Sequence, residues 1–83
     1  MSMSEYNRVL VPGLYRHFKG NLYRVLGTGR HSETQEEYVI YMSVSTGEIW
    51  LRPYDMFMSK VDRERYPKAG QGYRFEYVGE LKR

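Results

Sequence analysis

Residues 14–26 read LYRHFKGNLYRVL, two aromatic-rich runs separated by Gly20 and Asn21. Aromatic and β-branched side chains favour strands, and a Gly-Asn pair between two such runs is typical of a two-residue hairpin turn. Glycine at the first turn position suits the positive φ that this turn requires. The stretch therefore predicts an antiparallel hairpin in which Arg16 lies opposite Val25.

The two-residue period of a strand sorts the side chains of this hairpin onto two faces. The more apolar face is predicted to point inward; it carries Leu14, Arg16, Phe18, Tyr23 and Val25. The opposite face is basic near the turn; it carries Tyr15, His17, Lys19, Leu22, Arg24 and Leu26. A buried guanidinium needs a partner, so Arg16 is expected to form an ion pair or to bind an anion in a shallow pocket. Its candidate partners are Glu33, Asp55 and Glu76.

The rest of the chain alternates short apolar runs with turn residues. Residues 27–29 read Gly-Thr-Gly and predict a bulge or a sharp bend. Three further strands are expected at residues 37–43, 48–52 and 73–78. Both faces of the 37–43 run are apolar or aromatic, which indicates a central strand, and Pro53 is expected to begin one helical or 3₁₀ turn that extends to Met56. These signals predict a mainly β fold of five strands, closed into a small barrel that leaves no strand edge exposed.

Length and composition limit the class of protein. A chain of 83 residues has room for one domain, and the lack of cysteine excludes disulfide bonds and thiolate zinc sites. We expect a loosely ordered arm at residues 1–11, one domain at 12–79 and a polar tail at 80–83. The start of the chain is polar, and no stretch approaches the roughly 20 apolar residues of a membrane span, so no signal peptide and no membrane association are expected. We expect a cytoplasmic protein that is a monomer by default.

Several blocks of residues together resemble a known family. They are Gly13-x-Tyr15-Arg16-His17-Phe18-Lys19-Gly20, Tyr23-x-Val25-Leu26, His31-Ser32-Glu33-Thr34, Trp50-x-Arg52-Pro53, Met56-Phe57 and Arg74-Phe75. In order and spacing, these blocks are similar to the bacterial domain-of-unknown-function family 1653. The resemblance implies a bacterial origin and an SH3-like barrel, and it implies no activity.

The run His31-Ser32-Glu33 contains the residue types of nucleophilic catalysis. Neighbours along one chain rarely converge as a catalytic triad, and no G-x-S-x-G nucleophile elbow is present. The ordinary explanation is a turn held by local hydrogen bonds, and a binding role is the second. With His17, this run offers metal-ligand types, but the spacing does not bring them together. We therefore expect no catalytic residue, no metal site and no cofactor.

A second candidate site surrounds the predicted helical turn, and it comprises Trp50, Arg52, Pro53, Tyr54 and Met56. Aromatic side chains near such a turn line the peptide groove of SH3 domains, whereas a tryptophan beside an arginine suits base stacking. Phe57 is expected in the core, and Trp50 is expected either in the core or at the site. A third candidate is the basic set His17, Lys19, Arg24 and Arg30, which suits contact with phosphates, although a solvated charged face is the commoner explanation.

The lack of a catalytic motif and the clustered aromatic and basic residues favour a non-enzymatic binding module. Nucleic acid is the first candidate ligand, and a protein or peptide partner of the SH3 type is the alternative. An enzyme or accessory domain that uses His31 and Glu33 is the weakest of the three hypotheses. The predicted binding residues are His17, Arg24, His31, Ser32, Glu33, Trp50, Arg52, Pro53, Tyr54 and Met56.

Overall fold

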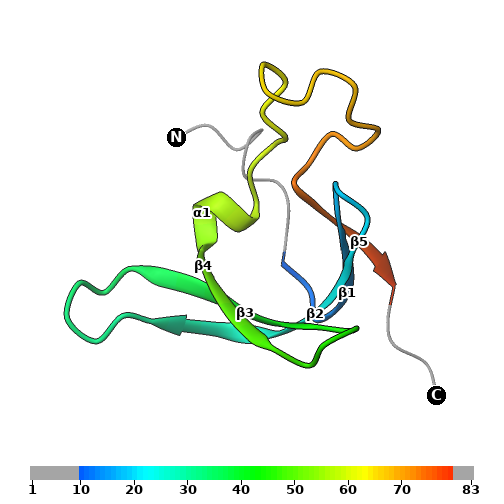
Figure 1. The fold of residues 1–83 in the computed structure, drawn as a ribbon. Coiled ribbons are helices and arrows are strands. Elements are labelled where there is room, and N and C mark those ends of the chain that lie inside the picture. Colours follow the sequence, from blue (N-terminus) through cyan, green and yellow to red (C-terminus); the bar gives the residue numbers. More distant parts are fainter. Residues whose placement is uncertain (1–9, 80–83) are drawn as a thin grey trace.

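The structure is a computed structural model that describes residues 10–79. Its elements are β1 (Gly13–His17), β2 (Leu22–Arg30), β3 (Glu37–Ser43), β4 (Ile49–Pro53), α1 (Tyr54–Phe57) and β5 (Phe75–Gly79) (Figure 1). The predicted mainly β fold with five strands and one helical turn is confirmed. Most of the predicted arm and the whole predicted tail lie outside the described residues. No helix within residues 10–79 has the length and apolar character needed to cross a membrane.

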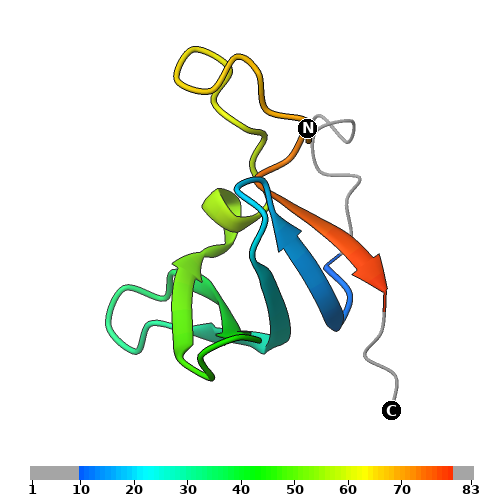
Figure 2. The ribbon, with the colours of Figure 1, turned by 45° about the vertical axis from the view of Figure 1, so that its right-hand side comes forward.

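The five strands form one antiparallel sheet in the order β4-β3-β2-β1-β5. Figures 1 and 2 show the sheet curling so that β4 and β5 flank its concave side. Within residues 10–79 no ladder joins these two strands, so the sheet is not closed into the expected barrel. The chain turns from β4 into α1 at Pro53, which has no N–H to donate to a ladder. It reaches β5 only after residues 58–74.

The first hairpin has a different register from the one predicted. Residues 18–20 form a three-residue loop, which is closed by a hydrogen bond from the Gly20 N–H to the His17 carbonyl oxygen at 2.7 Å. Arg16 therefore lies opposite Leu22, three positions from its predicted partner. Gly20 has a φ of 111°, so the predicted positive φ is confirmed although the loop is one residue longer.

This odd shift in register exchanges the two faces of β1 relative to β2. On β2, Val25 is buried as predicted. On β1, however, Tyr15 is buried and Arg16 is exposed beside Glu76 of β5, so the predicted inward position of Arg16 is wrong. His17 has the same strand parity as Tyr15 and therefore lies on the concave face, not on the outer face as predicted.

The core on the concave face is built mainly from aromatic rings. Phe57 of α1 is fully buried and stacks on Phe75 of β5, with ring centroids 4.1 Å apart and an interplanar angle of 10°. Its ring also meets Tyr15 and Tyr41 edge to face, at 5.6 and 5.2 Å. Aromatic pairs of this kind stabilise a fold by about 0.5–1.5 kcal/mol beyond the burial of their area. The predicted core position of Phe57 is confirmed.

The middle of the sheet follows the sequence pattern closely. The register of β2 against β3 shifts between Val25 and Gly27, which confirms the bulge predicted near residues 27–29. β2 continues beyond this bulge to Arg30, further than predicted. β3 covers the predicted residues 37–43 and pairs on both sides, as expected of a central strand.

Candidate functional site

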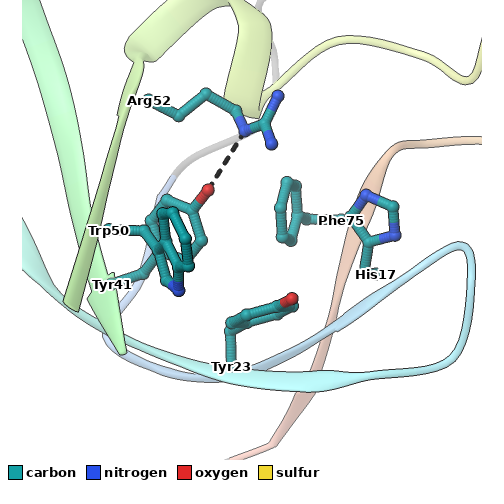
Figure 3. A pocket seen from close by; sticks show the side chains of 6 residues that line it. All are labelled: His17, Tyr23, Tyr41, Trp50, Arg52 and Phe75. Carbon is teal, nitrogen blue, oxygen red and sulfur yellow. Dashed lines mark hydrogen bonds between the residues drawn. The ribbon is translucent and has the colours of Figure 1, made fainter. Parts of the chain in front are cut away.

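A pocket of about 200 Å³ opens on the concave face, and every strand contributes to its lining. The lining residues are His17 on β1, Tyr23 on β2, Tyr41 on β3, Trp50 and Arg52 on β4, and Phe75 on β5. Figure 3 shows their side chains converging, with Trp50 and Arg52 on one side and Phe75 and His17 on the other. The pocket thus lies between the two edges of the open sheet. We call it the aromatic pocket.

The inner wall of the aromatic pocket is a set of rings in mutual contact. Tyr23, Tyr41 and Phe75 meet pairwise with centroids 5.4 to 5.8 Å apart and interplanar angles of 70° to 81°. These edge-to-face contacts fix the wall in one arrangement. Trp50 lies on the edge strand and is 48% exposed, so much of its ring surface is available to a ligand.

Arg52 is held in place by two aromatic neighbours. Its Nε–H donates a hydrogen bond to the Tyr41 hydroxyl at 3.1 Å, and its guanidinium carbon lies 5.7 Å from the centroid of the Phe75 ring (Figure 3). Among residues 10–79, neither terminal nitrogen of the guanidinium has a hydrogen-bond partner. Those two nitrogens can therefore form a planar fork toward a ligand.

His17 completes the opposite side of the aromatic pocket, with its ring 4.9 Å from Phe75 in edge-to-face contact. Its Nδ1 accepts a hydrogen bond from the Lys19 backbone N–H at 3.1 Å, so the neutral ring carries its proton on Nε2. Burial, together with the positive charges of Arg52, Arg74 and Lys19, lowers the pKa of His17 from 6.5 to about 4. At neutral pH the imidazole is therefore an uncharged hydrogen-bond donor.

This lowered pKa makes part of the folding stability depend on pH. The folded state favours the neutral ring, so the contribution is fully present above the unfolded pKa of 6.5 and is lost as the pH falls through about 4. We expect the urea midpoint to fall further on acidification from neutral pH to about pH 4 in the wild type than in His17→Asn, because an asparagine oxygen can accept the same hydrogen bond without titrating. An equal fall in both proteins would contradict the assignment. An NMR titration of the His17 ring measures the midpoint directly.

A second, basic pocket of about 250 Å³ adjoins the first and shares His17 and Arg52 with it. Its other lining residues are Phe18, Lys19, Asp62, Arg65, Tyr66 and Arg74. Four of its side chains are cationic and one is a carboxylate, so its field favours anions. The Lys19 Nζ and the Arg65 guanidinium both lie near the Tyr66 ring, at 5.2 and 5.7 Å from its centroid. We call this the basic pocket.

The structure brings together some of the predicted binding residues and separates others. His17, Trp50 and Arg52 share the aromatic pocket. Arg24 follows Tyr23 on β2 and so lies on the other face of the sheet. The remaining residues of the second candidate site line a separate pocket. They are Pro53, Tyr54 and Met56, and the acidic Glu36, Glu37 and Asp55 line the same pocket.

The His31-Ser32-Glu33 run lies in the loop between β2 and β3, outside the two pockets. The Nδ1 atom of His31 accepts hydrogen bonds from the backbone N–H groups of Glu33 and Thr34, at 3.1 and 3.2 Å. These contacts match the local-turn explanation of the run. In the part of the chain that the structure describes, no group of three His, Asp or Glu side chains is arranged to hold a metal ion.

Residue patterns did not single out several residues that line the two pockets. The two-residue period of the strand predicts Tyr23 on the inward face, but nothing local indicates that Tyr41 and Phe75 contact it. Arg65 and Tyr66 belong to a charged segment without a strand or helix pattern, and they reach the site because that segment folds back at the bridge between Lys60 and Tyr73.

The fold and the paired pockets define a small, mainly β domain with a candidate site on the concave face of its sheet. Residues 13–77 match the family model described as a protein of unknown function, DUF1653, and the chain belongs to that family. A crystal structure of a DUF1653 protein from Bordetella bronchiseptica is similar, with 34% identity, a TM-score of 0.73, and coverage of 89% of this chain and 94% of that one. The expected family membership is confirmed, and this neighbour supports a bacterial origin. A comparison with curated proteins found no match.

Proposed function

We propose that this domain is a non-enzymatic binding module for single-stranded nucleic acid, with one base in the aromatic pocket and the adjoining phosphates on the basic pocket. The observation that carries the proposal is the junction of the two pockets, which share His17 and Arg52. A nucleotide likewise joins a flat aromatic ring to an anion. Proteins that bind single strands combine stacking side chains with a cationic surface in the same way. We place this activity in the cytoplasm.

The size of the aromatic pocket supports the placement of the base, without its sugar and phosphate, inside it. Sites for whole small molecules typically enclose about 300–1,000 Å³. The aromatic pocket, at about 200 Å³, is smaller than that range and has room for a single ring system. A sugar and phosphate attached to the ring would lie outside it, where Lys19, Arg65 and Arg74 are available.

The charge of the site argues against a cationic ligand. Rings arranged around a pocket can also form a cage for a methylated ammonium group. In this pocket, however, the Arg52 guanidinium lies among the rings, and the rest of the basic pocket adds further positive charge. A cationic ligand in the pocket would be repelled by the Arg52 guanidinium, whereas a base with its phosphate would be attracted.

Replacing Trp50 by alanine tests the proposal. We expect Trp50→Ala to weaken binding of a short single-stranded RNA or DNA by roughly 5- to 150-fold, because stacking on one aromatic side chain contributes about 1–3 kcal/mol per base. Leu51→Ala is the matched control, since Leu51 is the next residue on β4, is 61% exposed and lies on the other face. The measurement is an NMR amide-shift titration at low and moderate salt.

The dependence of affinity on salt concentration tests the phosphate-binding part of the proposed site. Affinity should fall steeply with ionic strength in the wild type and in Trp50→Ala alike, because both retain the phosphate-binding cations. Shifts at His17, Trp50 and Arg52 that fade with salt would support the proposal. No shift with any oligonucleotide at low salt, or equal losses in Trp50→Ala and Leu51→Ala, would refute it.

A peptide ligand is the second candidate function, and a different pocket favours it. Pro53, Tyr54 and Met56 line a pocket with three carboxylate residues, and the Met56 side chain is 46% exposed. An extended peptide with a basic residue would fit this combination of apolar and acidic surface. Shifts confined to Tyr54 and Met56 on addition of a proline-rich basic peptide, with Trp50 unaffected, would favour this function over the first.

A further inference from the structure

The polar groups around the aromatic pocket are mainly hydrogen-bond donors. Arg52 presents its two terminal nitrogens, Trp50 has an indole N–H, and neutral His17 has an N–H at Nε2. The side-chain acceptors are the hydroxyl groups of Tyr23 and Tyr41, and that of Tyr41 already accepts from Arg52. None of the residues that line this pocket within the described chain is a carboxylate. Such a site suits a ring whose edge carries acceptors.

The four bases differ in this respect. Guanine presents two adjacent acceptors, O6 and N7, whereas thymine or uracil has the single acceptor O4 on the same edge. Adenine has a donating N6 amino group beside N7, and cytosine has a donating N4 amino group. A guanidinium fork can bind both guanine acceptors at once, and this is the commonest specific contact between a side chain and a base. Against adenine, one N–H of the fork would face another donor.

We infer that the aromatic pocket prefers guanine and that the Arg52 fork reads its O6 and N7 atoms. This inference rests on the proposed function and adds the identity of the preferred base to it. Stacking on Trp50 accepts any base, so the discrimination comes from the polar edge of the pocket. Arg52 is the only cationic side chain among the described residues that line the pocket.

The surroundings of Arg52 favour this bidentate contact with guanine. The hydrogen bond from its Nε–H to the Tyr41 hydroxyl and the contact of its guanidinium with the Phe75 ring restrain the side chain before any ligand arrives. A side chain that is already ordered loses less conformational entropy on binding. The two terminal nitrogens, which have no partner within residues 10–79, are the ones that a bidentate contact needs.

Base analogues test the inference on the unaltered protein. The four probes are fluorescent hexaadenylate itself and three versions in which one central adenosine is replaced by guanosine, inosine or 7-deazaguanosine. We expect guanosine and inosine, which both keep O6 and N7, to raise affinity by about tenfold or more over adenosine. We expect 7-deazaguanosine, which lacks N7, to lose most of that gain. Equal affinity for all four probes would overturn the guanine preference and leave the proposed function standing.

Substitution of Arg52 provides the matching protein test. Arg52→Lys keeps the positive charge but cannot form the fork, so we expect the guanosine-to-adenosine ratio to fall several-fold toward one while salt-dependent binding persists. Arg24→Lys is the control, because Arg24 lies on the other face of the sheet and should leave the ratio unchanged. An unchanged ratio in a folded Arg52→Lys protein would overturn the role of Arg52. If no probe binds at low salt, both the inference and the proposed function are refuted.

Discussion

Phe57→Ala is expected to lower the free energy of unfolding by about 3–5 kcal/mol, which is the usual cost of removing a buried phenylalanine side chain. Phe57 is fully buried and contacts rings from three strands, those of Tyr15, Tyr41 and Phe75. Native proteins are stable by only about 5–15 kcal/mol in total, so this loss would remove a large share of the stability of so small a domain. Because Phe57 is the buried residue of α1, the substitution also removes the anchor of that helix against the sheet.

Urea unfolding followed by circular dichroism measures this loss. Phe57→Leu is the control, because it keeps most of the apolar volume and should cost distinctly less. A loss below about 1 kcal/mol for Phe57→Ala would mean that α1 does not close the core as described.

Gly13→Ala is expected to cost about 2–4 kcal/mol, because a side chain at this position meets two obstacles. Gly13 has a φ of 136°, in the region that L-residues with side chains avoid. A Cβ atom placed there would also lie 2.9 Å from both the Gly79 carbonyl oxygen and the Tyr77 Cε1 atom. The carbonyl belongs to the backbone of β5, so relieving the contact would displace the β1–β5 pairing.

Gly20→Ala separates these two causes. Gly20 also has a positive φ, 111°, but a Cβ atom there would have no heavy atom within 4 Å. Gly20→Ala should therefore lower the free energy of unfolding through backbone strain alone, by about 1 kcal/mol. Thermal unfolding of both variants checks the order, and equal losses would contradict the steric contribution at Gly13.

Local pattern identified the strands better than it identified their register. The hairpin and its glycine at positive φ follow from residues 14–26, because aromatic runs and a Gly-Asn pair act over a few residues. The same residues are compatible with a loop of two or three residues, and only the hydrogen bond that closes the loop distinguishes the two. One extra loop residue placed Tyr15 inside and Arg16 outside, the reverse of the prediction.

The candidate site was less predictable because it depends on the curl of the whole sheet. Trp50 and Arg52 are an aromatic residue and a cation two positions apart, which is a local signal. Tyr23, Tyr41 and Phe75 come from three strands, and their rings meet only because the strands pair in this order and the sheet curls. The binding roles predicted for His31, Ser32 and Glu33 stay predictions, at a distance from the two pockets.

Within residues 10–79 no ladder joins β4 to β5, and this affects how the proposed binding site can change during evolution. In a closed barrel, backbone hydrogen bonds would fix the spacing between the first and last strands, and therefore the width of anything held between them. Here side chains such as Trp50, Arg52 and Phe75 span that space, without a ladder between the strands in the part of the chain that is described. Substitutions of the side chains between β4 and β5 can reshape the aromatic pocket while every strand pair remains intact. If the proposed function holds for homologues with the same sheet, they are therefore free to diverge in the molecules they recognise.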